Sequence, residues 1–65
     1  MKIVVNGEDA QTRAPTLADL LAELGFEGAV VATALNGTMV RAPRRAQTPI
    51  GEGDRIEILA PMQGG

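Results

Sequence analysis

TLADLLAELG, residues 16–25, is the stretch that decides the fold. Its leucines stand at positions 17, 20, 21 and 24, a spacing that places all four on one face of an α-helix. Thr16 supplies an N-cap oxygen, Asp19 occupies the capping-box position three residues later, and Gly25 suits the left-handed residue that follows a helix. We therefore predict one amphipathic helix, whose leucine face must be covered by other elements.

Segments with the pattern of strands lie on both sides of this helix. KIVVNGEDAQTR, residues 2–13, contains an Asn-Gly pair and predicts a hairpin whose second strand, about 9–13, is a polar edge. AVVATALN, residues 29–36, is rich in β-branched and small residues and is typical of a buried strand. A second Asn-Gly pair then precedes TMVR, residues 38–41, so the sequence predicts a second hairpin.

The rest of the chain adds a loop and a last strand. APRRAQTPIGEGD, residues 42–54, holds two prolines and two glycines and predicts a loop with one short helical turn. RIEIL, residues 55–59, alternates, so one face points inward. The first and last apolar strands belong side by side beneath the helix, because polar edges flank them. We predict an α+β fold over residues 1–60: a ubiquitin-like β-grasp with a mixed four- to five-stranded sheet packed on one α-helix.

The composition disfavours an enzyme. A chain of 65 residues has room for one small core and none for an enclosed active site. It contains no Cys, His, Trp or Tyr, so a histidine base, a cysteine nucleophile and a zinc site are all excluded. We predict no bound cofactor and no metal. The N-terminus has neither a signal peptide nor an apolar span, which indicates a cytoplasmic protein without membrane contact.

Net charge is -2, with no excess of basic residues for binding nucleic acid. The one basic cluster is Arg41, Arg44 and Arg45. Such a cluster is typical of a solvated loop. The alternative is a docking patch, which would fit an acidic protein surface better than a phosphate backbone, because no aromatic side chains accompany it to stack on bases.

PMQGG, residues 61–65, follows the last predicted strand. Pro61 cannot donate a ladder hydrogen bond, so we expect the chain to leave the sheet there as a flexible tail of about 17 Å when extended. Without a Cβ on Gly64 or Gly65, this arm could enter a narrow channel and present its α-carboxylate to another enzyme. The alternatives are a frayed end and a cloning scar.

Four segments together resemble the ThiS family of sulfur carriers in thiamin biosynthesis: NGE near the start, ALNG, EGDRIEIL and the final MQGG. The resemblance spans essentially the whole chain and is sharpest at residues 51–58 and 61–65. VRAPRRAQT departs from the VPR-x-x-W-like stretch of that family, because it lacks the aromatic residue and its proline is shifted.

The resemblance implies a carrier that is itself a substrate. An E1-like adenylyltransferase of the ThiF type would adenylate the carboxylate of Gly65, using ATP and Mg. A persulfide sulfur donor, such as a cysteine desulfurase, would convert the adenylate to a thiocarboxylate, and thiazole synthase of the ThiG type would receive the sulfur. Gly64 would thread the channel, and Gln63, Met62 and Leu59 are candidate partner contacts; for Leu59, a core position fits the sequence equally well.

Other functions remain open at this point. The small subunit of molybdopterin synthase uses the same terminal thiocarboxylate, although it usually has a longer helical region and an aromatic-rich approach to its tail. Ubiquitin-like modifiers also end in Gly-Gly. A third alternative is a non-covalent β-grasp binding module with an incidental tail.

Overall fold

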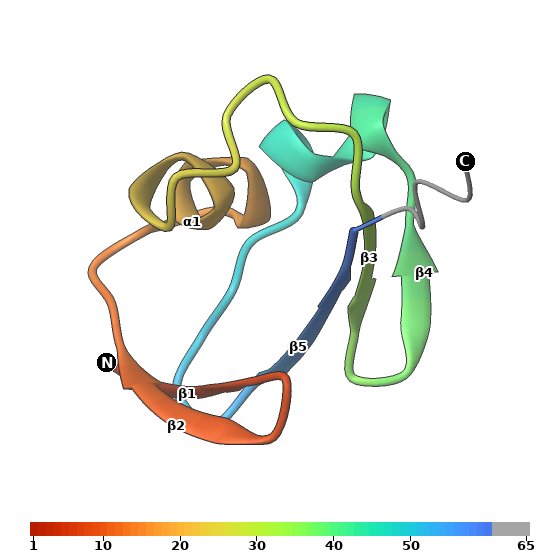
Figure 1. Ribbon diagram of the computed structural model, residues 1–65. Helices are drawn as coiled ribbons and strands as arrows, with labels where there is room; N and C mark the ends of the chain where they lie inside the picture. Colours follow the sequence, from red (N-terminus) through yellow and green to blue (C-terminus); the bar gives the residue numbers. More distant parts are fainter. Residues whose placement is uncertain (61–65) are drawn as a thin grey trace.

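The computed structural model describes residues 1–60. These residues form one five-stranded sheet, one α-helix and one 3-10 helix. In chain order the elements are β1 (Lys2–Val5), β2 (Glu8–Gln11), α1 (Leu17–Glu23), β3 (Ala32–Leu35), β4 (Thr38–Val40), η1 (Ala42–Gln47) and β5 (Arg55–Leu59). The helix packs on one face of the curved sheet (Figure 1). The predicted β-grasp fold is confirmed.

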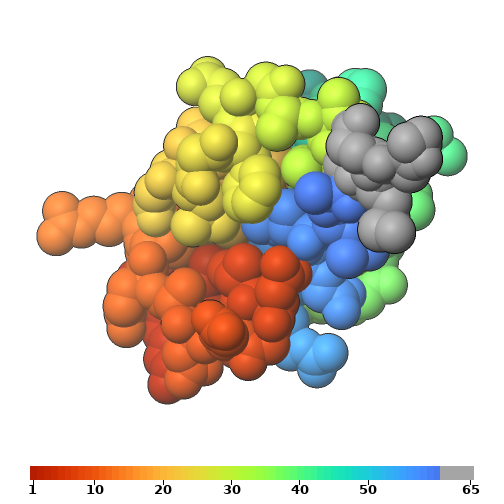
Figure 2. All heavy atoms as spheres, in the orientation of Figure 1, coloured from red at the N-terminus to blue at the C-terminus, as the bar shows by residue number. Residues whose placement is uncertain are grey.

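The strand order within the sheet is β2-β1-β5-β3-β4. β5 therefore lies in the middle, parallel to β1 and antiparallel to β3. In Figure 2 its blue atoms separate the red and orange N-terminal hairpin from the green β3–β4 hairpin. The predicted pairing of the first and last strands is confirmed. β1 and β3 pair with β5 directly, and β2 and β4 join the sheet through them.

Helix α1 begins and ends where the sequence predicts. The hydroxyl of Thr16 accepts a hydrogen bond from the Asp19 amide at 3.2 Å and donates one to the Asp19 carboxylate at 2.9 Å. Gly25 follows the helix with φ 89°, a left-handed conformation that favours glycine. Leu17, Leu20 and Leu21 are buried, whereas Leu24 is 40% exposed, so the buried face is narrower than the four-leucine pattern predicts.

The core lies between this helix and the inner face of the sheet. Its buried apolar residues are Ile3, Ala14, Leu17, Leu20, Leu21, Ile50, Ile56 and Ile58. Inward and outward side chains alternate along β5, as the sequence predicts for RIEIL. No other described element covers the opposite face of the sheet.

Two strands differ from their predicted limits. β2 begins at Glu8 and ends at Gln11, not at 9–13, because the two-residue Asn-Gly turn returns the chain at once and pairs Val5 with Glu8. β3 begins at Ala32, not at residue 29. Gly28, with φ 79°, lies in a turn in which the Ala29 amide bonds to the Phe26 carbonyl, so the chain joins the sheet only after this turn.

The prediction that residues 29–36 form a buried strand is also wrong for most of β3. Thr33 is buried, but Ala32 is exposed and Ala34 is only half-buried. The helix covers one face of the sheet, so alternate residues of β3 point toward the uncovered face. A run of small and β-branched residues is compatible with either arrangement, which is why the composition was misleading.

Candidate functional site

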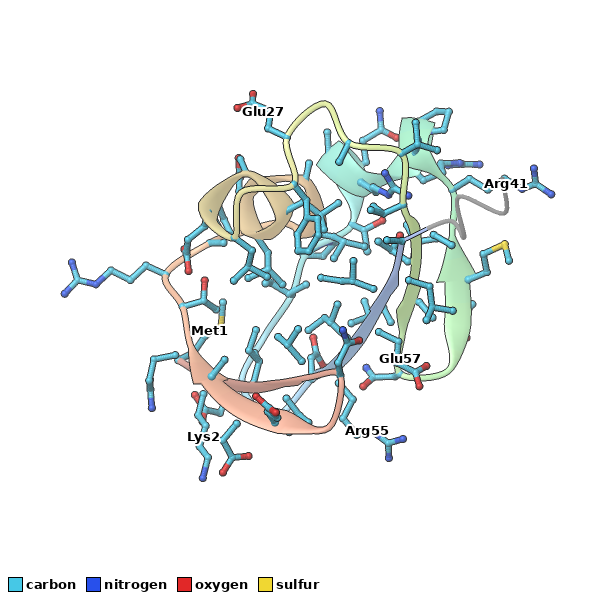
Figure 3. The ribbon with its side chains drawn as sticks, in the orientation of Figure 1. Met1, Lys2, Glu27, Arg41, Arg55 and Glu57 are labelled. Atoms are coloured by element: carbon cyan, nitrogen blue, oxygen red, sulfur yellow. The ribbon has the colours of Figure 1, made fainter. Side chains whose placement is uncertain are left out.

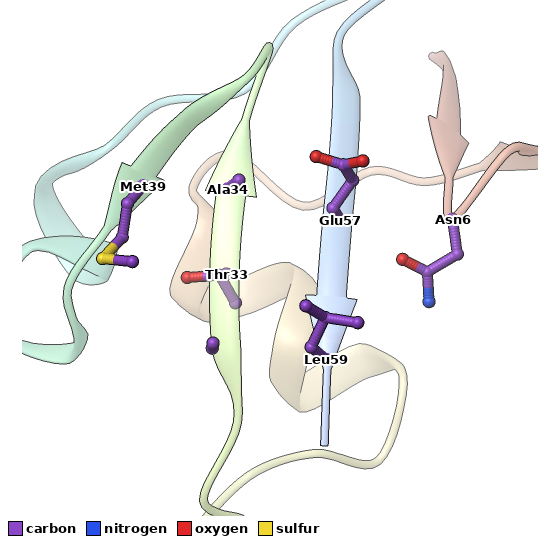
Figure 4. A pocket seen from close by; sticks show the side chains of 7 residues that line it. Asn6, Thr33, Ala34, Met39, Glu57 and Leu59 are labelled. Atoms are coloured by element: carbon purple, nitrogen blue, oxygen red, sulfur yellow. The ribbon is translucent and has the colours of Figure 1, made fainter. Parts of the chain in front are cut away.

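The outer face of the sheet carries a shallow apolar trough of about 410 Å³. Its floor is formed by the alanines of β3, and its walls by longer side chains of β5 and β4 (Figure 4). The register explains this shape: Ala32 pairs with Leu59, and Ala34 pairs with Glu57 on one side and Met39 on the other. The lining residues are Asn6, Ala32, Thr33, Ala34, Met39, Glu57 and Leu59.

Two large apolar side chains of the trough are left in solvent. Leu59 is 69% exposed and Met39 is 68% exposed. Fully burying a side chain of this size is favourable by about 1.5–3 kcal/mol. The trough can therefore provide the centre of a protein interface, with Glu57 on its polar margin.

Leu59 is the one predicted partner-binding residue that the structure describes. It is the last residue of β5, and it points to the outer face, away from the core. Met62, Gln63, Gly64 and Gly65 lie outside the described residues, as does the predicted tail 61–65. The trough thus adjoins the point from which that segment continues.

The three arginines of the basic cluster have different environments. Arg45 is half-buried: its Nε donates to Thr33 Oγ1 at 3.0 Å, and its Nη2 donates to the Val31 carbonyl at 2.6 Å. Arg45 therefore links η1 to the residues at the start of β3. Arg41 and Arg44 are exposed, as both a solvated loop and a docking patch require, whereas the half-buried Arg45 differs from the prediction of a solvated loop.

Arg41 lies at the end of the sheet where β5 ends at Leu59. It follows Val40, which pairs with Thr33, and Thr33 also pairs with Ile58. Figure 3 shows Arg41 projecting outward at one end of the sheet and Arg55 at the other. Within residues 1–60, no carboxylate lies within 4.0 Å of the Arg41 or Arg44 guanidinium.

The described part of the chain contains no group of three or more His, Cys, Asp or Glu side chains placed to hold a metal ion. In the same part, no helix is long and apolar enough to cross a membrane.

The sequence reasoning missed Met39, Ala32, Ala34 and Asn6 as site residues. Alternation along the second hairpin carries a signal for three of them, because Ala32, Ala34 and Met39 share one face when the Asn-Gly turn fixes the register. For Asn6, the sequence indicates only a place in the Asn-Gly turn. Its contact with β5 depends on strands that are distant in the sequence.

A five-stranded mixed sheet with one α-helix on one face and an uncovered apolar trough on the other defines the chain as a ubiquitin-like β-grasp domain. Comparison with known proteins identifies the family. The model of the ThiS family matches residues 3–65. The sulfur carrier protein ThiS of Thermus thermophilus is 36% identical over 61 residues, which cover 94% of this chain and 95% of that protein. The chain belongs to the ThiS family.

A structural comparison agrees with this membership. The crystal structure of a thiamine biosynthesis protein (ThiS) from Geobacter metallireducens superposes with a TM-score of 0.83 at 30% identity, covering 100% of both chains. A thiazole synthase of Paramagnetospirillum magneticum is 39% identical over 66 residues. That match covers 100% of this chain but 20% of the relative, so the chain spans about a fifth of the synthase's length.

Proposed function

We propose that this chain is a sulfur carrier of thiamin biosynthesis, with the carboxylate of Gly65 as its cargo site. The observation that carries the proposal is the family match, which extends through residue 65 and so includes Gly64 and Gly65. The chain itself supplies no catalytic residue. It acts as a substrate, and ATP and Mg are used by the partner adenylyltransferase.

The proposed chemistry has three steps at one carbon atom. A carboxylate oxygen of Gly65 attacks the α-phosphate of ATP, which forms an acyl-adenylate and releases pyrophosphate. The terminal sulfur of a protein persulfide then attacks the carbonyl carbon, and AMP leaves. Finally a thiol of the sulfur donor breaks the S–S bond of the acyl disulfide, so the donor becomes a disulfide and Gly65 becomes a thiocarboxylate.

The outer trough supports this role as the docking surface. A carrier must first be recognised by an adenylyltransferase of the ThiF type and then by thiazole synthase. Leu59 and Met39 offer exposed apolar area on a rigid sheet, directly beside the residues that precede the proposed acyl arm. In this proposal, residues 61–65 enter the partner while the trough is covered by it.

The thiazole synthase relative supports the choice of final acceptor. In that protein a segment similar to this whole chain makes up 20% of a longer polypeptide named for the synthase. Joining two activities in one polypeptide raises their effective concentration, which is useful when they act in sequence. We therefore favour thiazole synthase as acceptor over the molybdenum-cofactor pathway.

An intact-mass experiment tests the proposal. The protein is incubated with ATP, magnesium, a cognate adenylyltransferase and a persulfide donor. Replacement of one oxygen by sulfur should raise its mass by about 16 Da. A variant with one Ala added after Gly65 should fold normally and remain unmodified. An unchanged wild-type mass, with a partner proven active on another carrier, would overturn the proposal.

The acceptor is tested separately. The thiocarboxylated protein is offered to thiazole synthase and, in a parallel reaction, to the large subunit of molybdopterin synthase. Sulfur transfer to thiazole synthase is expected. Transfer to the molybdopterin enzyme alone would retain the carrier chemistry but reassign the pathway.

A further inference from the structure

The end of β5 is supported differently on its two sides. On one side, β3 pairs with β5 as far as Leu59, which lies opposite Ala32. On the other side, β1 pairs with β5 only as far as Ile56, which lies opposite Val5. The peptide groups of Ile58 therefore lie beyond the ladder that β1 provides, two residues after its last pair.

Asn6 takes the place of β1 beside Ile58, where the β1–β5 ladder has ended. Its backbone amide still donates to the Ile56 carbonyl at 2.9 Å, but the chain then turns away, with φ 50° at Asn6 and φ 83° at Gly7. Its side chain continues the ladder: Oδ1 accepts from the Ile58 amide at 2.8 Å, and Nδ2 donates to the Ile58 carbonyl at 3.1 Å. Figure 4 shows the Asn6 carboxamide beside β5.

A carboxamide suits this task because it carries both a donor and an acceptor, as a peptide group does. Aspartate would offer only acceptors when ionised, and it would face the Ile58 carbonyl. The left-handed backbone adds a second constraint, because Asn tolerates it better than most residues. Asn6 therefore meets two requirements, the tight turn and the support of β5.

Asn36 performs the matching task at the other end of the same strand. It also occupies a left-handed position, with φ 51°, in the Asn-Gly turn of the second hairpin. Its Oδ1 accepts from the Arg55 amide at 2.9 Å, and its Nδ2 donates to Asp54 Oδ1 at 3.1 Å. Each hairpin turn thus holds one end of β5, and of the two asparagines it is Asn6 that holds the end leading to residues 61–65.

We infer that Asn6 is a positioning residue for the acyl arm, a role that rests on the proposed function. By fixing Ile58, it fixes the orientation of Leu59 in the trough and the point from which the arm departs. Without it, Ile58 and Leu59 are held by β3 alone, and each residue that leaves this remaining ladder adds about 3.3–3.6 Å of loose chain between the trough and Gly65. A partner would then have to order this residue on binding.

The test compares two matched glycine variants, Asn6→Gly and Asn36→Gly. Glycine accepts the left-handed backbone at both sites, so each variant keeps its turn and loses only the asparagine side-chain bonds, to Ile58 in one variant and to Arg55 and Asp54 in the other. Urea unfolding establishes how much stability each one loses. Amide hydrogen exchange is then measured at Ile58 and Leu59, and the KM and kcat of adenylation by pyrophosphate exchange with a cognate adenylyltransferase.

Asn6→Gly should accelerate exchange at Ile58 and Leu59 and raise KM by roughly 5- to 30-fold, the entropic cost of ordering about one backbone residue. Asn36→Gly should leave both readouts close to wild type at a similar loss of stability. Asn6→Asp, which keeps an acceptor for the Ile58 amide, should be intermediate. This variant decides the matter if Asn6→Gly does not fold: a wild-type KM for it would contradict the inference.

Equal KM values for the two glycine variants, with the wild-type protein active, would overturn the inference alone. Absence of pyrophosphate exchange with the wild-type protein and an active partner would instead overturn the proposed function, and the inference with it. The wild-type reaction therefore separates the two failures.

Discussion

Truncation of Leu59 to alanine should weaken partner docking without weakening the fold. The side chain is 69% exposed, so about two thirds of its burial energy is still available to a partner. Since full burial of a leucine side chain is favourable by about 1.5–3 kcal/mol, docking should lose roughly 1–2 kcal/mol. This corresponds to about a 5- to 30-fold rise in the dissociation constant for the adenylyltransferase, measured by isothermal titration calorimetry. The urea midpoint should change little, because Leu59 contributes little to the core.

Leu24→Ala is the matched control, because it removes the same atoms from another partly exposed leucine, at the end of α1. It should lower the urea midpoint slightly and leave the dissociation constant unchanged. The reasoning is refuted if Leu59→Ala binds as tightly as the wild type, or if both variants lose the same affinity. Equal losses would mean that the partner does not distinguish the trough from the helix side of the molecule.

Three further predictions concern stability, each measured by urea unfolding followed by circular dichroism. Arg45→Ala should cost about 1.5–3 kcal/mol, because it removes charge-assisted hydrogen bonds from a half-buried site, whereas exposed Arg44→Ala should cost less than about 0.5 kcal/mol; equal costs would contradict the linking role of Arg45. Thr16→Ala should cost about 0.5–2 kcal/mol by leaving the Asp19 amide without its cap, and an unchanged midpoint would argue against this cap. Leu20→Ala should cost about 2–5 kcal/mol, enough to unfold much of a domain this small, so a cooperative transition near the wild-type midpoint would contradict the assigned core.

Much of the fold could be predicted because local signals and long-range packing agree. Thr16, the leucine spacing and Gly25 define α1 from neighbouring residues alone. The alternation of RIEIL identifies β5 and its inward face in the same way. Its central position could be predicted because the other candidate strands are more polar and therefore suit the edges of the sheet. This comparison needs only the sequence itself.

The start of β3 could not be predicted because it depends on a turn and on a distant side chain. Val31 is as suitable for a strand as Ala32, but its carbonyl accepts from Arg45, fourteen residues later. The site was only partly predictable for the same reason. Leu59 could be named from its place at the end of the strand. Predicting the trough requires the register among β5, β3 and β4. Predicting the role of Asn6 requires knowing that it contacts a residue 52 positions away.

The position of β5 has a consequence for synthesis of the protein on the ribosome. β5 is the last strand of the described chain, yet it is the only link between the β1–β2 hairpin and the β3–β4 hairpin in the sheet. A nascent chain that stops before residue 55 therefore holds two separate hairpins, and isolated hairpins are marginally stable at best. Folding of residues 1–60 is thereby coupled to translation of β5. Products that terminate before β5 should remain unfolded and be degraded, so they would not compete with the folded domain for its partners.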